Sequence, residues 1–224
     1  MESIWNLIIY FAICSFLGWF IQAIVDLFQR KKITNTGFLY GPFIPLFGFT
    51  ASIIYFFDLY FISYSFPFRL AIYFILPTAM EYFTGFLLEK IFRVKLWDYS
   101  YQRFNIKGRI SLAVSVVWFF LILFQVFVLQ EKILLAINQF SEIFRIILAT
   151  GLLIYFLIDS FFSAKMFYYF SKLKREFGKI DLEKLNKRFN KKIKSIKNKI
   201  KISPVFKRNI NKDIQEFIEK FSKK

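Results

Sequence analysis

Residues Met80 to Ser111 read MEYFTGFLLEKIFRVKLWDYSYQRFNIKGRIS, and this stretch decides how the chain is organised. Its first part is an apolar run that contains two carboxylates, Glu81 and Glu89. Its second part is a dense polar and aromatic connector. A charged side chain inside a membrane segment is costly unless it is paired or hydrated, so these carboxylates are candidates for a functional site.

The whole chain is rich in apolar residues. Of its 224 residues, 57% are hydrophobic and 34 are Phe, whereas soluble domains have about 45–50% apolar residues. Several runs exceed the roughly 18 apolar residues that mark a membrane-spanning helix. The composition therefore predicts an all-α, polytopic protein of the cell membrane. No basic segment precedes the first apolar run, and no small-residue cleavage pattern follows it, so no cleavable signal peptide is expected.

Five membrane spans are predicted, at about 4–28, 42–61, 68–92, 110–129 and 143–170. They form a transmembrane domain over 1–171, followed by a tail over 172–224. Lys and Arg cluster in alternate connections: three lie at 30–32, six between 90 and 109, and 19 from 172 onward, against three on the opposite side. Because Lys and Arg favour cytoplasmic loops, we expect the N-terminus outside and the tail in the cytoplasm.

Several residue types that support chemistry are rare or absent. The chain has no histidine, and Cys14 is its one cysteine. We therefore expect no disulfide, no metal site and no histidine-based catalysis, so any acid–base chemistry would fall to Asp, Glu, Lys or Tyr. We also expect no cofactor and no catalytic residue, and we predict that the protein is not an enzyme. No glycine opens the phosphate-binding pattern G-x-x-x-x-G-K-[ST], so an ATP-driven role would require a separate ATPase.

Five polar residues within apolar runs form a candidate polar membrane site. Glu81 is expected near the bilayer centre, and Glu89 about 12 Å further along, near the cytoplasmic boundary. Because no span has a basic residue near its middle, Glu81 is either protonated or hydrogen-bonded to a group such as Gln22, Gln125 or a tyrosine. A proton or cation relay and a neutral hydrogen bond between helices both remain open. The five residues are Gln22, Asp26, Glu81, Glu89 and Asp159.

Glycines and prolines interrupt the entry to the second span, which indicates backbone that is not continuous helix. In a membrane such backbone is buried in protein or lines a cavity, and in some transporters it binds substrate. A plain helix entry, with Pro42 near the first turn, is the alternative. The residues of this broken-helix segment are Gly37, Gly41, Pro42, Pro45 and Gly48.

The connector combines aromatic and charged residues at the predicted cytoplasmic face. Trp97, Tyr99 and Tyr101 are expected at the headgroup level, which Trp and Tyr favour. Asp98 and Arg109 are expected to be partners, or to share one site with Glu89 and Asn105. A lipid-modifying enzyme that uses Glu89, Asp98 and Arg109 is the third-ranked function. The interfacial motif comprises Trp97, Asp98, Tyr99, Asn105, Gly108 and Arg109.

The tail is predicted to be helical and amphipathic, with apolar residues at spacings of three and four and a net charge of +13 over 172–224. A basic amphipathic helix is typical of membrane-surface binding, so we expect contact with anionic lipid. A coiled-coil or partner-helix face is the alternative, and no nucleic-acid partner is expected. The apolar stripe begins with Leu185, Phe189, Ile193, Ile196 and Ile200.

Six motifs over roughly the first 120 residues resemble those of the putative ABC-transporter type IV permeases. The motifs are Gly18-Trp19, Gly37 to Gly48, Glu81-Tyr-Phe-Thr-Gly85, Leu88-Glu-Lys90, Trp97-Asp-Tyr-Ser100 and Asn105-Ile-Lys-Gly-Arg-Ile110. Four sites depart from the family pattern: Gln22 stands in place of a glutamate, Thr36 in place of an arginine, Leu46-Phe47 in place of an Ile-Tyr-like pair, and Lys95-Leu-Trp97 in place of a double Trp.

The resemblance implies a multi-pass bacterial membrane protein with a role in transport. We therefore expect a permease-like transporter subunit without its own ATPase, with a separate ATPase or another membrane protein as partner. The alternative is a non-catalytic membrane scaffold or regulator that binds lipid or a partner through its basic tail.

The predicted orientation can be tested by cysteine labelling. Single cysteines at Ser65 and Asn138 are expected to react with an impermeant reagent added outside intact cells, because both lie in connections poor in Lys and Arg. A cysteine at Ser195 is expected to stay unlabelled. Labelling at Ser195 would reverse the orientation.

Overall fold

The computed structural model describes residues 3–31, 37–61 and 63–177. The chain divides into two compact units, Met1–Ser171 and Lys172–Lys224. All of the described residues except 172–177 belong to the first unit. The predicted amphipathic tail helices lie outside the described residues.

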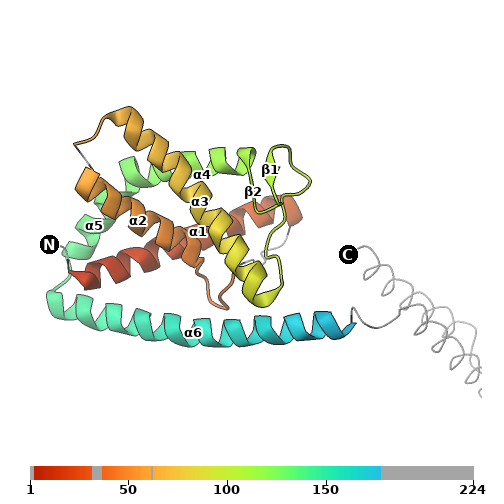
Figure 1. Ribbon diagram of the computed structural model, residues 1–224. Helices are drawn as coiled ribbons and strands as arrows, with labels where there is room; N and C mark the ends of the chain where they lie inside the picture. Colours follow the sequence, from red (N-terminus) through yellow and green to blue (C-terminus); the bar gives the residue numbers. More distant parts are fainter. Residues whose placement is uncertain (1–2, 32–36, 62, 178–224) are drawn as a thin grey trace, which may run out of the picture. The chain divides into compact units, whose positions relative to one another are not determined.

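The described residues form five helical segments and one very short β-hairpin (Figure 1). The segments are α1 (Ile4–Arg30), α2 (Pro45–Phe61), α3 (Phe66–Phe92), the continuous run α4 (Leu112–Phe124), η1 (Gln125–Leu129) and α5 (Gln130–Asn138), and α6 (Glu142–Phe177). The hairpin pairs β1 (Asn105–Ile106) with β2 (Ile110–Ser111) in antiparallel register. Four stretches are long and apolar enough to cross a membrane: Ile4–Phe28, Phe66–Phe92, Leu112–Asn138 and Glu142–Tyr169.

Three helix boundaries differ from those expected by three residues or more. α2 begins at Pro45 instead of 42, because the amide of Ile44 is bound 2.9 Å away by the carbonyl of Ser15 in α1, which holds the entry out of a helix. With 17 residues, α2 is shorter than the four long stretches. The helix predicted to end at 129 continues to Asn138 through the π-helical turn η1, and α6 runs past 170 to Phe177.

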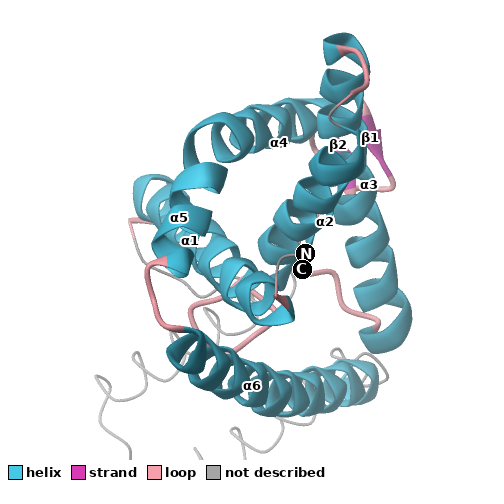
Figure 2. Ribbon diagram, turned by 90° about the vertical axis from the view of Figure 1, so that its left-hand side faces the viewer, coloured by secondary structure: helices cyan, strands magenta, loops and turns pink. Residues whose placement is uncertain are grey.

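α1 and α2 pack closely because glycine lies at their contact. A Cβ atom on Gly48 would lie 2.6 Å from the carbonyl oxygen of Phe11, so only glycine allows this approach. Gly18 similarly lies against the ring of Phe47. Next to this contact, Tyr10 and Cys14 of α1 and Tyr55 of α2 belong to one buried apolar cluster, which Ile137 of α5 and Ala149 of α6 complete. α6 runs along one side of the other helices (Figure 2).

Two polar clusters join helix ends on the side predicted to be extracellular. Arg69 of α3 donates to Asp58 of α2 at 3.2 Å and to the Tyr73 hydroxyl at 2.9 Å, and Tyr73 also donates to Asp58. This ion pair fixes the α2–α3 connection, because breaking it would leave a buried charge without a partner. In the sequence, an Asp late in one apolar run and an Arg early in the next indicate this ion pair.

The second cluster joins three helices. Arg145 of α6 donates to Asn6 of α1 at 2.8 Å and to Asn138 of α5 at 3.0 Å, and the Asn6 amide donates to Asn138 at 3.0 Å. It fixes the beginning of α6 against α1 and α5.

The glycine contact predicts different effects of the same substitution at two helical glycines. Gly48→Ala is expected to lower the free energy of unfolding by about 1–3 kcal/mol, because the new methyl group overpacks against backbone. Gly151→Ala in α6 is the matched control, since a Cβ there would meet no atom within 4 Å. It should be neutral or slightly stabilising. Thermal unfolding in detergent measures both, and equal melting temperatures would contradict the close contact.

Candidate functional site

The connector between α3 and α4 folds back along α3. Arg93 ends α3 in the left-handed conformation, with φ of 54°. The Trp97 indole then donates to the carbonyl of Arg109 at 2.9 Å, and the Tyr99 amide donates to that of Gly108 at 2.8 Å. Gly85 of α3 leaves space for the Trp97 ring, because a Cβ atom on residue 85 would lie only 3.3 Å from that ring.

The inward position of the connector changes which aromatic residues are exposed. Trp97 and Tyr99 are half-buried against the protein. Tyr101, by contrast, is 81% exposed. Their position at the headgroup level stays a prediction.

Asn105 and Gly108 hold the shape of the hairpin. The Asn105 amide donates to the carbonyl of Gln102 at 2.7 Å, and its oxygen accepts from the Gly108 amide at 3.1 Å. Gly108 has φ of +70°, and a Cβ there would collide with Asp98 and Ser100. These two motif residues therefore position the loop.

Asp98 belongs to the same loop and pairs with its neighbours. It accepts from the Ser100 hydroxyl, from the Ser100 amide at 3.0 Å and from Lys95 at 3.1 Å. These bonds, the Ser100 hydroxyl first, lower the pKa of Asp98. A lowered pKa means that their contribution to stability is complete above the ordinary carboxyl pKa and is lost as the pH falls through the lowered value. The expected pairing of Asp98 with Arg109 is wrong.

Arg109 instead pairs with Glu89 of α3. Its Nε and Nη2 atoms donate to one Glu89 oxygen at 2.9 and 2.7 Å, and Nη1 donates to the Tyr82 hydroxyl at 3.1 Å. The guanidinium also lies over the rings of Tyr82 and Phe86, 5.3 and 5.2 Å from their centroids. The bond to Glu89 raises the pKa of Arg109, which keeps its charge. The connector is thus clamped to the last turns of α3.

Two helical turns before Glu89, the connector also reaches Glu81. The Tyr99 hydroxyl donates to Oε1 of Glu81 at 3.1 Å, and Trp118 of α4 lies close to the same carboxyl. Glu81 is only 3% exposed, and its Oε2 atom has no hydrogen-bond partner within the described part of the chain. Burial and the neighbouring Glu81 raise the pKa of the Tyr99 phenol, which therefore remains a neutral donor.

Of the partners expected for Glu81, the tyrosine is the one found. Gln22 donates to Asp26 at 3.5 Å, which confirms that these two share a face of α1. Gln125, in the π-helical turn η1, donates to Tyr10 of α1 and to Gln130 of α5. Neither glutamine bonds Glu81.

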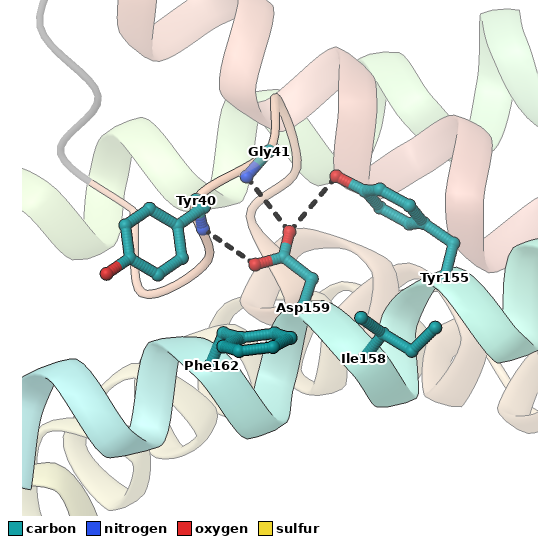
Figure 3. Close-up of a pocket in the computed structure, with 6 residues that line it drawn as sticks. All are labelled: Tyr40, Gly41, Tyr155, Ile158, Asp159 and Phe162. Atoms are coloured by element: carbon teal, nitrogen blue, oxygen red, sulfur yellow. Dashed lines mark hydrogen bonds between the residues drawn. The ribbon is translucent and has the colours of Figure 1, made fainter.

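Asp159 of α6 receives four hydrogen bonds, of which Figure 3 shows those from Tyr40, Gly41 and Tyr155. Oδ1 accepts from the Tyr40 amide at 2.9 Å and from Ser163 at 3.0 Å. Oδ2 accepts from the Gly41 amide at 2.9 Å and from the Tyr155 hydroxyl at 3.0 Å. A Cβ on Gly41 would collide with that hydroxyl, so a larger residue there would displace the Tyr155 side chain from Asp159. The non-helical segment is therefore bound by a carboxylate of the chain itself.

The predicted site residues thus fall into separate places. Glu81, Glu89 and Arg109 meet at the connector, Asp159 meets Gly41, and the pair of Gln22 and Asp26 lies on α1. The sequence reasoning missed Tyr40, Tyr155 and Ser163. The two side-chain donors could have been found, because Tyr155 and Ser163 lie four residues before and after Asp159 and so share its helix face. The amide of Tyr40 carries no sequence signal.

The described residues contain helices of membrane-spanning length, buried carboxylates within those helices and a connector that packs against them, which together fit a membrane protein. The chain belongs to the family described as "Putative ABC-transporter type IV", whose model matches residues 9–164. The match confirms the resemblance seen in the sequence and extends it through Asp159. No curated protein and no solved structure matches the chain.

The bond between Tyr99 and Glu81 predicts that two neighbouring tyrosines differ in importance. Tyr99→Phe is expected to lower the free energy of unfolding by about 1–3 kcal/mol, because it leaves a buried carboxyl oxygen without a donor. Tyr101→Phe, the matched control, should have no effect because Tyr101 is exposed.

A double-mutant cycle with Glu81→Gln, followed by thermal unfolding in detergent, measures this coupling. The expected coupling is at least about 0.5 kcal/mol, as for other residues in contact. Strict additivity of the two substitutions would show that Tyr99 and Glu81 do not interact.

Proposed function

We propose that the protein is the permease-like subunit of a transporter in the cell membrane, without catalytic activity of its own, and that a separate ATPase drives it. Family membership and the apolar helices support this. The sequence contains no phosphate-binding loop of its own, so the energy source belongs to a partner.

The observation that carries the proposal is the bond between Tyr99 in the connector and Glu81 inside α3. A transporter driven from outside the membrane needs a physical link between the partner's surface and the membrane interior. Tyr99 supplies this link, since it lies in the connector predicted to face the cytoplasm and bonds a carboxylate well inside α3. The Arg109–Glu89 pair makes the link stiff.

The tip of the connector is suited to contact the partner. Tyr101, Phe104 and Ile106 are 81%, 79% and 53% exposed. Phe104 and Lys107 both have positive φ, 54° and 55°, which non-glycine residues adopt at a cost. Backbone strain of this kind clusters at functional sites. Phe104 is thus both strained in its backbone and exposed at the tip of the connector.

A scaffold or regulator is the second candidate. In this case the basic tail would bind anionic lipid or a partner helix, as its net charge of +13 and apolar stripe indicate. A scaffold requires no ATP hydrolysis, whereas the proposed permease depends on an ATPase partner. ATP hydrolysis by the isolated complex therefore distinguishes the two functions.

The test is ATP hydrolysis by the complex isolated in mild detergent from the protein's native membranes through an affinity tag on the full chain. We expect ATP hydrolysis and a polypeptide labelled by azido-ATP in the wild-type preparation. Phe104→Ala is expected to reduce both by about tenfold, the effect of losing one interfacial anchor of about 1–2 kcal/mol. Phe140→Ala, which removes an exposed phenylalanine from the opposite end of the helices, is the matched control.

No ATP hydrolysis in the wild-type preparation would overturn the permease proposal in favour of the scaffold. Equal hydrolysis by the Phe104 and Phe140 variants would keep the ATPase but exclude the connector tip as its contact.

A further inference from the structure

Glu81 is a buried carboxyl group without a countercharge in the described part of the chain. It lies in the stretch Phe66–Phe92, which is long and apolar enough to cross a membrane, and it is 3% exposed. The ion pairs found among the described residues do not include it; they are Arg69–Asp58, Lys95–Asp98 and Arg109–Glu89. Neither solvent nor a basic side chain of these residues therefore compensates a negative charge on Glu81.

The groups around Glu81 are neutral. The Tyr99 hydroxyl, from the connector, donates to Oε1 at 3.1 Å, and Trp118 of α4 lies close to the same carboxyl. The Arg109 guanidinium is bound to Glu89 and to the Tyr82 hydroxyl instead. Oε2 of Glu81 has no hydrogen-bond partner among the described residues. Because these contacts compensate little of a full charge in apolar surroundings, the carboxyl group gains stability by binding a proton.

Asp58 shows that a buried oxygen without a partner does not by itself make such a site. Asp58 is 6% exposed, and its Oδ2 atom also lacks a partner among the described residues. Its Oδ1 atom, however, is paired with the Arg69 guanidinium at 3.2 Å, so its charge is compensated. Glu81 combines burial and an unfilled oxygen with the absence of such a pair in the described part of the chain.

The surroundings of Glu81 fit a proton better than a metal ion. A metal ion such as Ca²⁺ needs several oxygen ligands, and the described residues contain no group of three or more His, Cys, Asp or Glu that could hold one. A proton needs one oxygen. On uptake it bonds to Oε2 and removes the negative charge, while Oε1 continues to accept from Tyr99. On release the carboxylate forms again.

Tyr99 links the binding of this proton to the connector. A hydrogen bond to a carboxylate is stronger than one to a neutral acid, so the Tyr99 hydroxyl favours the ionised form of Glu81. A connector that withdraws Tyr99 would increase the proton affinity of Glu81. By thermodynamic reciprocity, uptake of the proton would weaken the hold of α3 on the connector.

We propose that Glu81 is a reversible proton-binding site inside the membrane, and that the connector controls its proton affinity through Tyr99. The proposal decides between the two roles that the sequence leaves open for Glu81, in favour of a carboxyl group that exchanges its proton. It uses the same connector as the proposed function and rests on the position of α3 in a membrane, but it requires no ATPase.

The test is infrared difference spectroscopy of the full chain in phosphatidylcholine vesicles, recorded over a pH series. A protonated carboxylic acid has a C=O band that the carboxylate lacks. We expect a band that persists above about pH 5, where exposed carboxyl groups are ionised, and that disappears as the pH rises further. Glu81→Gln is expected to remove this band. Glu131→Gln, at an exposed glutamate of α5, is the matched control and should retain it.

A second pair of variants leaves the carboxyl group in place, so the test does not depend on the folding of Glu81→Gln. Tyr99→Phe is expected to move the C=O band to higher frequency, because Oε1 loses its donor. It should also raise the pH at which the band disappears by about one unit, a tenfold increase in proton affinity for one lost hydrogen bond to a charged group. Tyr101→Phe, at an exposed tyrosine, should change neither.

Three results would overturn the proton-binding site. They are the absence of a band that depends on Glu81, a band that stays constant over the whole pH series, and loss of the band when sodium replaces potassium at constant pH. The second would show a permanently neutral hydrogen bond, and the third a metal cation as the ligand. Equal spectra of the Tyr99 and Tyr101 variants would overturn control by the connector. None of these outcomes depends on ATP hydrolysis, so this proposal and the proposed function can fail separately.

Discussion

A backbone that leaves the helical conformation at membrane depth must find other partners for its amides, because lipid offers none. In this protein the constraint falls on residues 37–44, between α1 and α2. Asp159 binds the amides of Tyr40 and Gly41, and the carbonyl of Ser15 binds the amide of Ile44. One loop is thereby tied to α1 on one side and to α6 on the other. The start of α2 and the position of the last helix both depend on this arrangement.

The same constraint explains why the intramembrane carboxylates are separate in the structure. Each one is satisfied by a different part of the chain: Asp58 by Arg69, Glu81 by Tyr99, Glu89 by Arg109 and Asp159 by the loop and two hydroxyls. Buried charges in a membrane are stable when paired or hydrogen-bonded. Glu81 and Asp58 each have one buried oxygen that lacks a hydrogen-bond partner among the described residues. The other oxygen of Glu81 accepts from Tyr99 and so joins α3 to the connector.

The sequence predicted the helical class, the approximate spans and the family, because these depend on long apolar runs and on local motifs. It also identified Glu81, Glu89, Arg109 and Asp159 as candidates, since charged residues stand out in such runs. It did not predict that the connector folds back, because the bond between Tyr99 and Glu81 joins residues 18 positions apart and depends on space at Gly85. Helix ends differed from the prediction where tertiary contacts override propensity. The π-helical turn at Gln125 carries a helix past polar residues that would ordinarily end a span.

The position of α6 shows how few contacts can place a membrane helix. Much of its surface is exposed and apolar, and apolar surface alone gives no driving force for association between helices in lipid. Polar contacts and close ring packing must therefore decide where it lies. Arg145 fixes its beginning, Asp159 fixes its middle, and the rings of Phe156 and Phe167 pack against Phe43 and Phe38 of the non-helical loop. Three of these four contacts involve residues 37–44. The conformation of that short loop and the position of α6 therefore depend on each other through these contacts.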